Sequence, residues 1–230
     1  MSQHPVQFIL TDIEGTTTSI SFVADELFPY FRENIHELLN MQDLSVVREA
    51  FDETVSLAHS ADGLTIASNE ELLETLYRWS VEDRKITPLK TLQGILWEKG
   101  YKDGILKAHV FSDVAPKLQE WQEAGVGLGV FSSGSVAAQK LLFGYSIAGD
   151  LTPLFTHYFD TTAGGKREIT TYRTISSKLL IEPKNILFLS DIVEELQAAE
   201  EAGFQTVQLV RPGTIAGWKT TASDFTEVII

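Results

Sequence analysis

The sequence predicts an α/β protein, a doubly wound parallel sheet into which a helical domain is inserted. Short apolar runs of the kind found in buried parallel strands alternate with helical patterns over residues 110–230. Several of these helical patterns end at a glycine, which favours helix termination. Residues 21–109 carry one helical pattern after another and no convincing strand. We therefore expect a core domain from residues 1–20 and 110–230, and an inserted helical cap from residues 21–109.

Two patterns predict the elements of the core. Continuous apolar runs predict strands, and apolar residues at helical spacing predict helices. Five apolar runs are the expected strands, the third being the weakest: residues 6–10, 126–131, 157–160, 186–189 and 206–210. Four helical patterns precede or follow the later strands: residues 113–124, 135–143, 168–180 and 194–202. Because strand and helix alternate, the strands are expected to pair in parallel.

Helical spacing also describes the cap. Apolar residues recur at helical intervals between Phe22 and Leu39. Farther along, Ser68 and Glu71 form a capping-box pattern ahead of the next apolar residues. These apolar residues are expected to form the core of the cap. The cap would join the core domain through two short crossings near residues 19–21 and 108–111, and such crossings can act as hinges.

Composition excludes several classes of function. A chain of 230 residues with a formal net charge of -14 repels phosphate backbones and anionic lipid surfaces, so we expect neither a nucleic-acid nor a membrane partner. The absence of cysteine removes disulfides, thiolate zinc sites and a cysteine nucleophile. No apolar stretch approaches the length of a membrane span, and the N-terminus does not read as a secretion signal. The expected location is therefore the cytoplasm.

The first group of candidate catalytic residues follows the first expected strand. Asp12 and Glu14 place two acids there, next to the permissive Gly15. In open α/β sheets, ligands bind at the carboxyl ends of strands. A carboxylate can attack phosphorus to give an aspartyl phosphate if a cation offsets the repulsion between the two anions, and Asp12 is the natural attacker. Acids, glycine and threonine are also ordinary residues of a turn, so this string alone leaves both interpretations open.

Hydroxyl groups and a lysine follow two other expected strands. Ser132 and Ser133 end the second strand, where hydroxyls and helix N–H groups suit a phosphate. Alternatively, Ser133 or Ser135 only caps the following helix. Lys166 follows two glycines after the weak third strand and could place a fixed positive charge between phosphoryl oxygens and the attacking carboxylate. A lysine taken alone would be assigned to the solvated surface.

A second pair of acids ends the fourth expected strand. Asp191 lies at the strand end, and Glu195 lies four residues farther on. Acids at this spacing at a helix start can lie on the same face of the helix. Asp191 can therefore bind Mg²⁺, while Glu195 does not touch the ion but contacts and orients the residues that do. The alternative is that the acids of this helix start only complement the helix dipole, which is the role we expect for Glu194.

Together, an acid, a hydroxyl, a lysine and an acid each follow a different strand of one expected parallel sheet, and those ends converge in space. This order resembles the four motifs of the haloacid-dehalogenase phosphatases along the whole chain. The resemblance implies Asp12 as the nucleophile, Ser132 as a phosphate ligand, Lys166 as a charge clamp and Asp191 as a metal ligand.

Longer strings narrow the resemblance to the enolase-phosphatase family of methionine salvage, also called acireductone synthases. They are residues 11–17, 19–23, 27–29, 92–97 and 132–144. The resemblance implies enolisation of 2,3-diketo-5-methylthiopentyl-1-phosphate, followed by loss of phosphate to give 1,2-dihydroxy-3-keto-5-methylthiopentene. It also implies a monomer with one Mg²⁺ per chain.

The same resemblance implies metal positions at Asp12, Glu14 and Asp191, and substrate positions at Ser132, Ser133 and Lys166. The second acid of the first motif, usually aspartate and a general acid in the wider superfamily, is Glu14 here, as in the enolase-phosphatase family. An enol oxygen leaves more readily than a sugar alkoxide and needs a proton less. The residues do not identify the base for enolisation.

Three other functions compete with this interpretation. A phosphatase of another small phosphorylated metabolite would share the core motifs and differ in the cap. A catalytically silent binding protein would be expected to lack Asp12, Lys166 or Asp191, and all three are present. A dehalogenase would not need Mg²⁺ or an acidic metal site. Arg211, with the proline and glycine that follow it, is expected only to form a turn.

Overall fold

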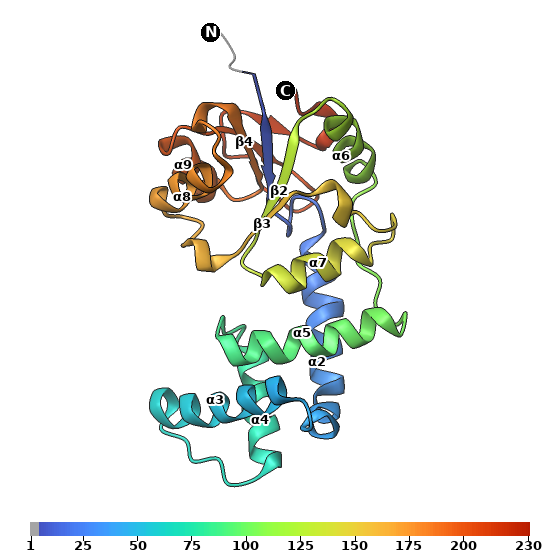
Figure 1. Ribbon diagram of the computed structural model, residues 1–230, viewed down its shortest axis with the longest axis vertical. Coiled ribbons are helices and arrows are strands. Elements are labelled where there is room, and N and C mark those ends of the chain that lie inside the picture. The colour runs from blue at the N-terminus through green and yellow to red at the C-terminus, as the bar shows by residue number, and fades with distance from the viewer. Residues whose placement is uncertain (1–4) are drawn as a thin grey trace. The chain divides into compact units, whose positions relative to one another are not determined.

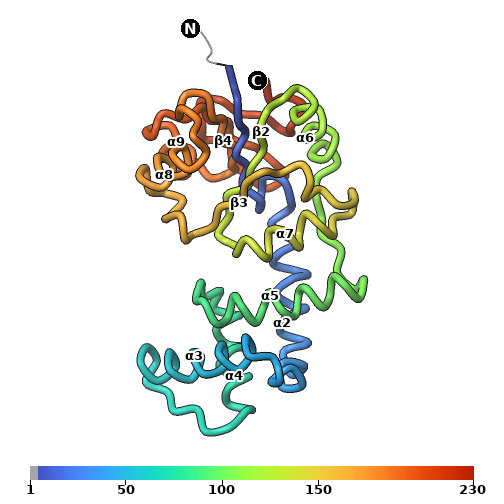
Figure 2. The backbone as a smooth tube through the Cα atoms, viewed as in Figure 1, coloured from blue at the N-terminus to red at the C-terminus, as the bar shows by residue number. Residues whose placement is uncertain are grey.

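The computed structural model describes residues 5–230 (Figures 1 and 2). The chain forms two compact units. The core unit comprises the described residues up to Phe22 together with Lys107–Ile230, and the inserted unit is Val23–Leu106. The chain therefore leaves the core unit once, after its first strand, and returns to it once.

The core unit contains one parallel sheet of six strands. Its strands are β1 (Phe8–Thr11), β2 (Gly127–Phe131), β3 (His157–Phe159), β4 (Ile186–Ser190), β5 (Gln205–Leu209) and β6 (Thr221–Ala222). Their order in the sheet is β3-β2-β1-β4-β5-β6, and every neighbouring pair is parallel. The predicted doubly wound sheet and its five strands are confirmed. The two-residue β6 was not predicted.

Helices flank this sheet as the alternating pattern indicated. The four predicted helices are α6 (Val114–Glu123), α7 (Val136–Gly144), α8 (Ile169–Leu179) and α9 (Val193–Glu201). Short turns of helix complete the unit: α1 (Ile20–Phe22), η3 (Thr152–Leu154), η4 (Thr161–Ala163), η5 (Pro183–Asn185) and η6 (Phe225–Glu227). Figure 1 shows α8 and α9 on one side of the strands and α6 on the other.

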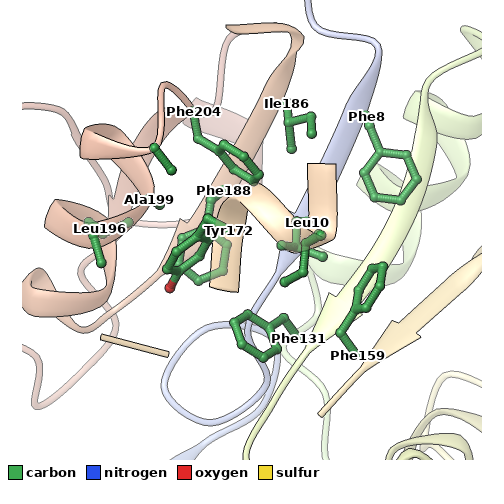
Figure 3. Close-up of a cluster of buried hydrophobic side chains, with 13 residues drawn as sticks. Phe8, Leu10, Phe131, Phe159, Tyr172, Ile186, Phe188, Leu196, Ala199 and Phe204 are labelled. Atoms are coloured by element: carbon green, nitrogen blue, oxygen red, sulfur yellow. The ribbon is translucent and has the colours of Figure 1, made fainter. Parts of the chain in front are cut away.

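Alternate residues of the central strands point to opposite faces, so each face receives its own apolar layer. Toward α8 and α9, aromatic and aliphatic side chains form a continuous buried cluster (Figure 3). Tyr172 of α8 lies at its centre, with its ring within 6 Å, centroid to centroid, of the rings of Phe131, Phe188 and Phe204. This layer fixes α8 and α9 against the strands that end at the site described below.

All regular secondary structure assigned in the inserted unit, residues 23–106, is helical, and turns and irregular segments join the helices. Its elements are η1 (Val23–Leu27), α2 (Phe28–Asn34), η2 (Ile35–Met41), α3 (Ser45–Asp62), α4 (Asn69–Val81) and α5 (Thr87–Lys102). The predicted capping box is confirmed, because Ser68 Oγ accepts from the Glu71 amide and the Glu71 carboxylate accepts from the Ser68 amide. Asp62 accepts from Arg78, Trp79 and Arg84 and so joins the end of α3 to α4.

The two crossings of the chain lie side by side inside the core unit. The Ser19 amide donates to His109 Nδ1 at 3.2 Å, and the Phe111 amide donates to the Thr17 carbonyl at 3.0 Å. His109 is therefore a hydrogen-bonded residue of the fold. None of the helices found in residues 5–230 has the length and apolar character that crossing a membrane requires.

Candidate active site

Three of the predicted site residues directly follow adjacent strands. Asp12 follows β1, Ser132 follows β2 and Asp191 follows β4. Because β2, β1 and β4 are neighbours and run in parallel, these residues lie along one edge of the sheet. Hydrogen bonds across the strand ends hold them there, from the Asp12 amide to the Leu189 carbonyl at 2.9 Å and from the Ser132 amide to the Phe159 carbonyl at 3.2 Å.

Lys166 lies between two carboxylates. Its Nζ is 2.7 Å from Asp12 Oδ1 and 2.7 Å from Glu195 Oε2, and all three side chains are buried. The Tyr172 hydroxyl donates to the Lys166 carbonyl at 2.6 Å and so fixes the main chain of the lysine to α8. The structure thus brings together Asp12, Lys166 and Glu195, which are separated by up to 183 residues in the sequence, and places the lysine in the site, not on the surface.

Asp12, Lys166 and Glu195 form a buried triad. Its pKa values are set by burial and by the excess of two carboxylates over one ammonium group. Burial alone would lower the pKa of Lys166, but the adjacent carboxylates of Asp12 and Glu195 outweigh it, so the pKa is raised and the ammonium form persists. Burial, and then repulsion by Asp12, raises the pKa of Glu195 to about 7, although Lys166 and Ser190 act in the opposite direction. The triad therefore holds one fixed positive charge and a carboxyl group that titrates near neutral pH.

The turn after Asp12 brings the main chain against Asp191. Three successive amides, those of Thr16, Thr17 and Thr18, donate to the Ile13 carbonyl and close the turn. Gly15 has φ +71°, a conformation that favours glycine, and a Cβ added there would overlap the Asp191 carboxyl group. Glycine is needed at this position for both reasons, because any side chain would push Asp191 away from the turn.

Asp191 has the features of a cation ligand. Its Oδ1 is buried and has no hydrogen-bond partner in the structure. Burial, followed by repulsion from Asp12, raises the pKa of its carboxyl group to about 6. A buried, unpartnered carboxylate oxygen beside a second carboxylate is costly unless a cation or a proton joins them. Hard oxygen ligands of this kind suit Mg²⁺, so the residues present fit that ion.

Glu14 does not place its side chain with the other two acids. Its side chain is exposed, although its charge is near enough to contribute to the raised pKa of Asp191. Among residues 5–230, no three acidic or histidine side chains gather closely enough to hold a metal ion together.

The serine residues divide between ligand and structural positions. Ser132 is buried, and its Oγ accepts from the Gly134 amide at 3.2 Å, which leaves the hydroxyl proton available for a ligand. Ser133 is half-buried in the turn that leads to α7. Ser135 is the N-cap of α7 and accepts from the Ala138 amide, as the structural alternative proposed. The Val136 amide donates to Asp160, so two of the first amides of α7 are already used by the protein.

Glu195 contacts the lysine of the site. The sequence predicted a supporting role for it behind the metal ligands, which stays a prediction, and in the structure its Oε2 accepts from Ser190 Oγ at 2.9 Å and contacts Lys166. The Ser190 hydroxyl in turn accepts from the Ile192 amide. Glu195 therefore acts on the lysine side of the site, while Asp191 faces Gly15.

Two residues of this region were not selected from the sequence. Gln208 in β5 donates to the Asp191 carbonyl, and Arg211, assigned only to a turn, donates to the Thr16 carbonyl. A signal for Gln208 existed, because a glutamine inside an apolar strand buried on both faces must find partners for its amide. Arg211 gave no comparable signal, since its partners are 98 and 195 residues away.

Comparisons with known proteins identify the family of the chain. Residues 6–203 match the haloacid dehalogenase-like hydrolases. The chain is 51% identical to enolase-phosphatase E1 of Picosynechococcus sp. over 92% of each protein. It is 48% identical to enolase-phosphatase E1 of Pseudomonas fluorescens over 97% of each.

Solved structures give the same result for the fold. The UTR4 protein of Saccharomyces cerevisiae is 32% identical, with a TM-score of 0.81 over 97% of this chain and 100% of that chain. The L-2-haloacid dehalogenase of Xanthobacter autotrophicus is 16% identical, with a TM-score of 0.55 over 96% of this chain and 95% of that chain, and is similar in fold alone. With relatives at 48% and 51% identity along nearly its whole length, the chain belongs to the enolase-phosphatase E1 family of the haloacid dehalogenase-like hydrolases.

Proposed function

We propose that the protein converts 2,3-diketo-5-methylthiopentyl-1-phosphate to 1,2-dihydroxy-3-keto-5-methylthiopentene and phosphate, a step of methionine salvage. The observation that carries this proposal is the contact of Lys166 with Asp12 at the strand ends, beside the unpartnered oxygen of Asp191. Phosphoryl transfer to aspartate requires a nucleophilic carboxylate, a fixed positive charge and an anionic ligand for a metal ion.

In the phosphoryl step, a carboxylate oxygen of Asp12 forms a bond to phosphorus while the bond from phosphorus to the enol oxygen breaks. Water then hydrolyses the aspartyl phosphate and releases phosphate. Lys166, whose ammonium contacts Asp12, is placed to hold the phosphoryl oxygens and to offset their charge as the two anions approach. The Ser132 hydroxyl, and the neighbouring Ser133, would donate to the same oxygens.

Mg²⁺ would be held by the carboxylates of Asp12 and Asp191 and by the main-chain carbonyl of Glu14. When bound, it supplies charge neutralisation for phosphoryl transfer and polarisation of a substrate carbonyl for enolisation. The exposed carboxyl group of Glu14 would then transfer a proton, either in enolisation or at the leaving oxygen.

The test is an assay of the diketo phosphate that follows enol absorbance and free phosphate together, with Mg²⁺ and with a chelator. We expect both signals with Mg²⁺ and neither with the chelator. Asp12→Asn is the matched control, because the amide is isosteric but a poor nucleophile, so it should release no phosphate. Hydrolysis of p-nitrophenyl phosphate at an equal or higher specificity constant would instead indicate a phosphatase of another metabolite. The cytoplasmic location and the monomeric state stay predictions, which cell fractionation and gel filtration would check.

A further inference from the structure

Strand β5 carries none of the residues assigned to phosphoryl transfer, yet two side chains in or just after it bond the main chain of Asp191 and of the turn after Asp12. Gln208 lies within the strand, and Arg211 lies two residues beyond its last residue. Gln208 is 1% exposed and Arg211 is 5% exposed. Polar side chains buried to this extent require full hydrogen bonding, and their partners show what they hold in place.

Gln208 holds the main chain of Asp191. Its Nε2 donates to the Asp191 carbonyl at 2.9 Å and to the Ile215 carbonyl at 3.0 Å. Its Oε1 accepts from the amides of Gly217 and Trp218. Both donors and both acceptor positions of the amide are thus used, so the side chain has one orientation and fixes the Asp191 peptide relative to the loop after β5.

Arg211 holds the turn that follows Asp12. Its Nε donates to the Thr16 carbonyl at 3.0 Å, in the turn that carries Glu14 and Gly15. Its two terminal nitrogens donate to the two carboxylate oxygens of Asp113 at 2.9 and 2.7 Å. The guanidinium carbon lies 4.2 Å from the centroid of the Phe111 ring. This fork-to-fork pair gives the arginine a rigid position.

The two halves held in this way touch each other. A Cβ on Gly15 would overlap the Asp191 carboxyl group, so the turn and the acid have no spare distance between them. A shift of either main chain changes where Asp191 Oδ1 points, and this is the oxygen that has no protein partner. Metal affinity is sensitive to such shifts, because the residues that hydrogen-bond to metal ligands fix the orientation of those ligands.

We propose that Gln208 and Arg211 are positioning residues of the proposed Mg²⁺ site. They hold the Asp191 carboxylate and the turn after Asp12 at the separation that Mg²⁺ requires. This inference rests on the proposed Mg²⁺ site. Its prediction is a loss of Mg²⁺ affinity that exceeds any loss caused by destabilising β5 in general.

The chain offers a matched control on the same strand. Gln205 begins β5, and its Nε2 donates to the Lys184 carbonyl at 2.8 Å, at the opposite end of the strand from Asp191. Gln205→Met and Gln208→Met therefore remove the same kind of bond from the two ends of one strand. For Arg211 we choose Arg211→Lys, because the ammonium keeps a positive charge facing Asp113 but cannot bond Thr16 and both Asp113 oxygens together.

The experiment titrates Mg²⁺ into each metal-free protein by calorimetry, without substrate, after thermal melts in chelator have shown that each variant is folded. We expect Gln208→Met and Arg211→Lys to bind Mg²⁺ about 10- to 100-fold more weakly, the range found when partners behind metal ligands are removed. Gln205→Met should bind like the parent protein. In turnover assays, the two site variants should recover activity when Mg²⁺ is raised.

Parent-like affinity in both site variants would overturn the inference, as would an equal loss in Gln205→Met. Should Gln208→Met not fold, Gln208→Glu replaces it, because it keeps the oxygen that accepts from Gly217 and Trp218 while removing the donors to Asp191 and Ile215. If the parent protein itself bound no Mg²⁺, the metal site of the proposed function would fail and this inference with it. Parent binding with unchanged variants would remove the positioning role alone.

Discussion

Lys166 determines the charge balance of the strand-end site. One ammonium group faces two carboxylates within 2.7 Å, and a third carboxyl group, that of Asp191, lies close enough for its pKa to be raised by Asp12. With all three acids ionised, the single ammonium group leaves excess negative charge, which a bound cation would offset. This charge balance supports the proposal that the site binds a divalent ion and phosphoryl oxygens.

Lys166→Ala should lower turnover by about 10²-fold or more, the scale seen when a preorganised electrostatic partner is removed. It should also destabilise the protein, because Asp12 and Glu195 lose their buried counterion. Lys184→Ala is the control, since Lys184 pairs with Glu182 at the surface. Steady-state kinetics and thermal melts measure both effects. A turnover loss no larger than that of the control would contradict the assigned role.

Asp191→Asn tests the metal site through pH. Burial raises the pKa of Asp191 to about 6 in the folded protein from its ordinary value of 3.8, so the folded chain binds more protons than the unfolded chain between these values. The free energy of unfolding of the metal-free protein should fall as pH rises through this window. Mg²⁺ binds the ionised form and should raise Tm more at pH 7 than at pH 5.

The Asn variant cannot ionise, so it should lose this part of the pH dependence and most of the Mg²⁺-induced rise in Tm. Thermal melts at a series of pH values, in chelator and in Mg²⁺, measure both quantities. A variant that kept the full Mg²⁺ effect would show that Asp191 does not bind the ion.

Glu14→Gln separates the two chemical steps. The side chain is exposed, and the proposed Mg²⁺ site uses only the main-chain carbonyl of Glu14, so Mg²⁺ binding should survive the change. Proton transfer by a placed side chain contributes about 10²–10⁴-fold, so one step should slow by that order. Accumulation of enol phosphate would assign Glu14 to the phosphoryl step, and absence of both enol and phosphate would assign it to enolisation. Parent rates for both steps would leave the carboxyl group without a role in proton transfer.

At the scale of elements, the sequence predicted those strands and helices whose formation depends on residues close together in the chain. The run before Asp12 became β1 and the run before Asp191 became β4, because apolar residues bounded by polar ones define a buried strand. The two-residue β6 has no periodicity to detect, and it is held by distant hydrogen bonds, such as that from the Val210 amide to the Ala222 carbonyl.

The site, too, has a part that the sequence predicted and a part that it could not predict. The strand ends placed Asp12, Ser132 and Asp191 along one edge of the sheet, because parallel strands end together. The partner of Glu195 could not be predicted, because helical spacing gives the face on which a side chain lies but not what the facing loop supplies. The contact between Arg211 and Thr16 joins residues 195 positions apart, and no local pattern carries that information.

Helix α8 makes its own contribution through Tyr172. The ring is fully buried, and the hydroxyl donates to the Lys166 carbonyl. Tyr172→Phe keeps the ring and leaves that buried carbonyl without this donor, so it should cost about 1–3 kcal/mol of stability. Tyr158→Phe is the control, because the Tyr158 hydroxyl is buried without a partner, and its removal should cost little. Denaturant titration measures both variants. Equal costs would mean that the bond to Lys166 is not what stabilises the loop.

At the scale of the whole molecule, the residues assigned to phosphoryl transfer all belong to the core unit. Asp12 precedes the insertion, and Ser132, Lys166, Asp191 and Glu195 follow it. The core unit has its own apolar layer between the sheet and α8 and α9, and its two crossings are already held together by the bond from Ser19 to His109. A short linker can therefore join the two crossings without changing the sheet.

Deleting residues 23–106 and joining Phe22 to Lys107 through a short glycine and serine linker should leave a folded core that still hydrolyses p-nitrophenyl phosphate with Mg²⁺. The deletion removes none of the residues assigned to that chemistry, but it removes the helical unit, in which members of one fold family vary their substrate choice. We expect the preference for the diketo phosphate over p-nitrophenyl phosphate to be lost, as measured by the ratio of the two kcat/KM values. Asp12→Asn in the shortened chain controls for background hydrolysis. A shortened chain that retained the parent ratio would place substrate selection in the core unit, among residues such as Ser133 and Glu14, and would remove this role from the inserted helices.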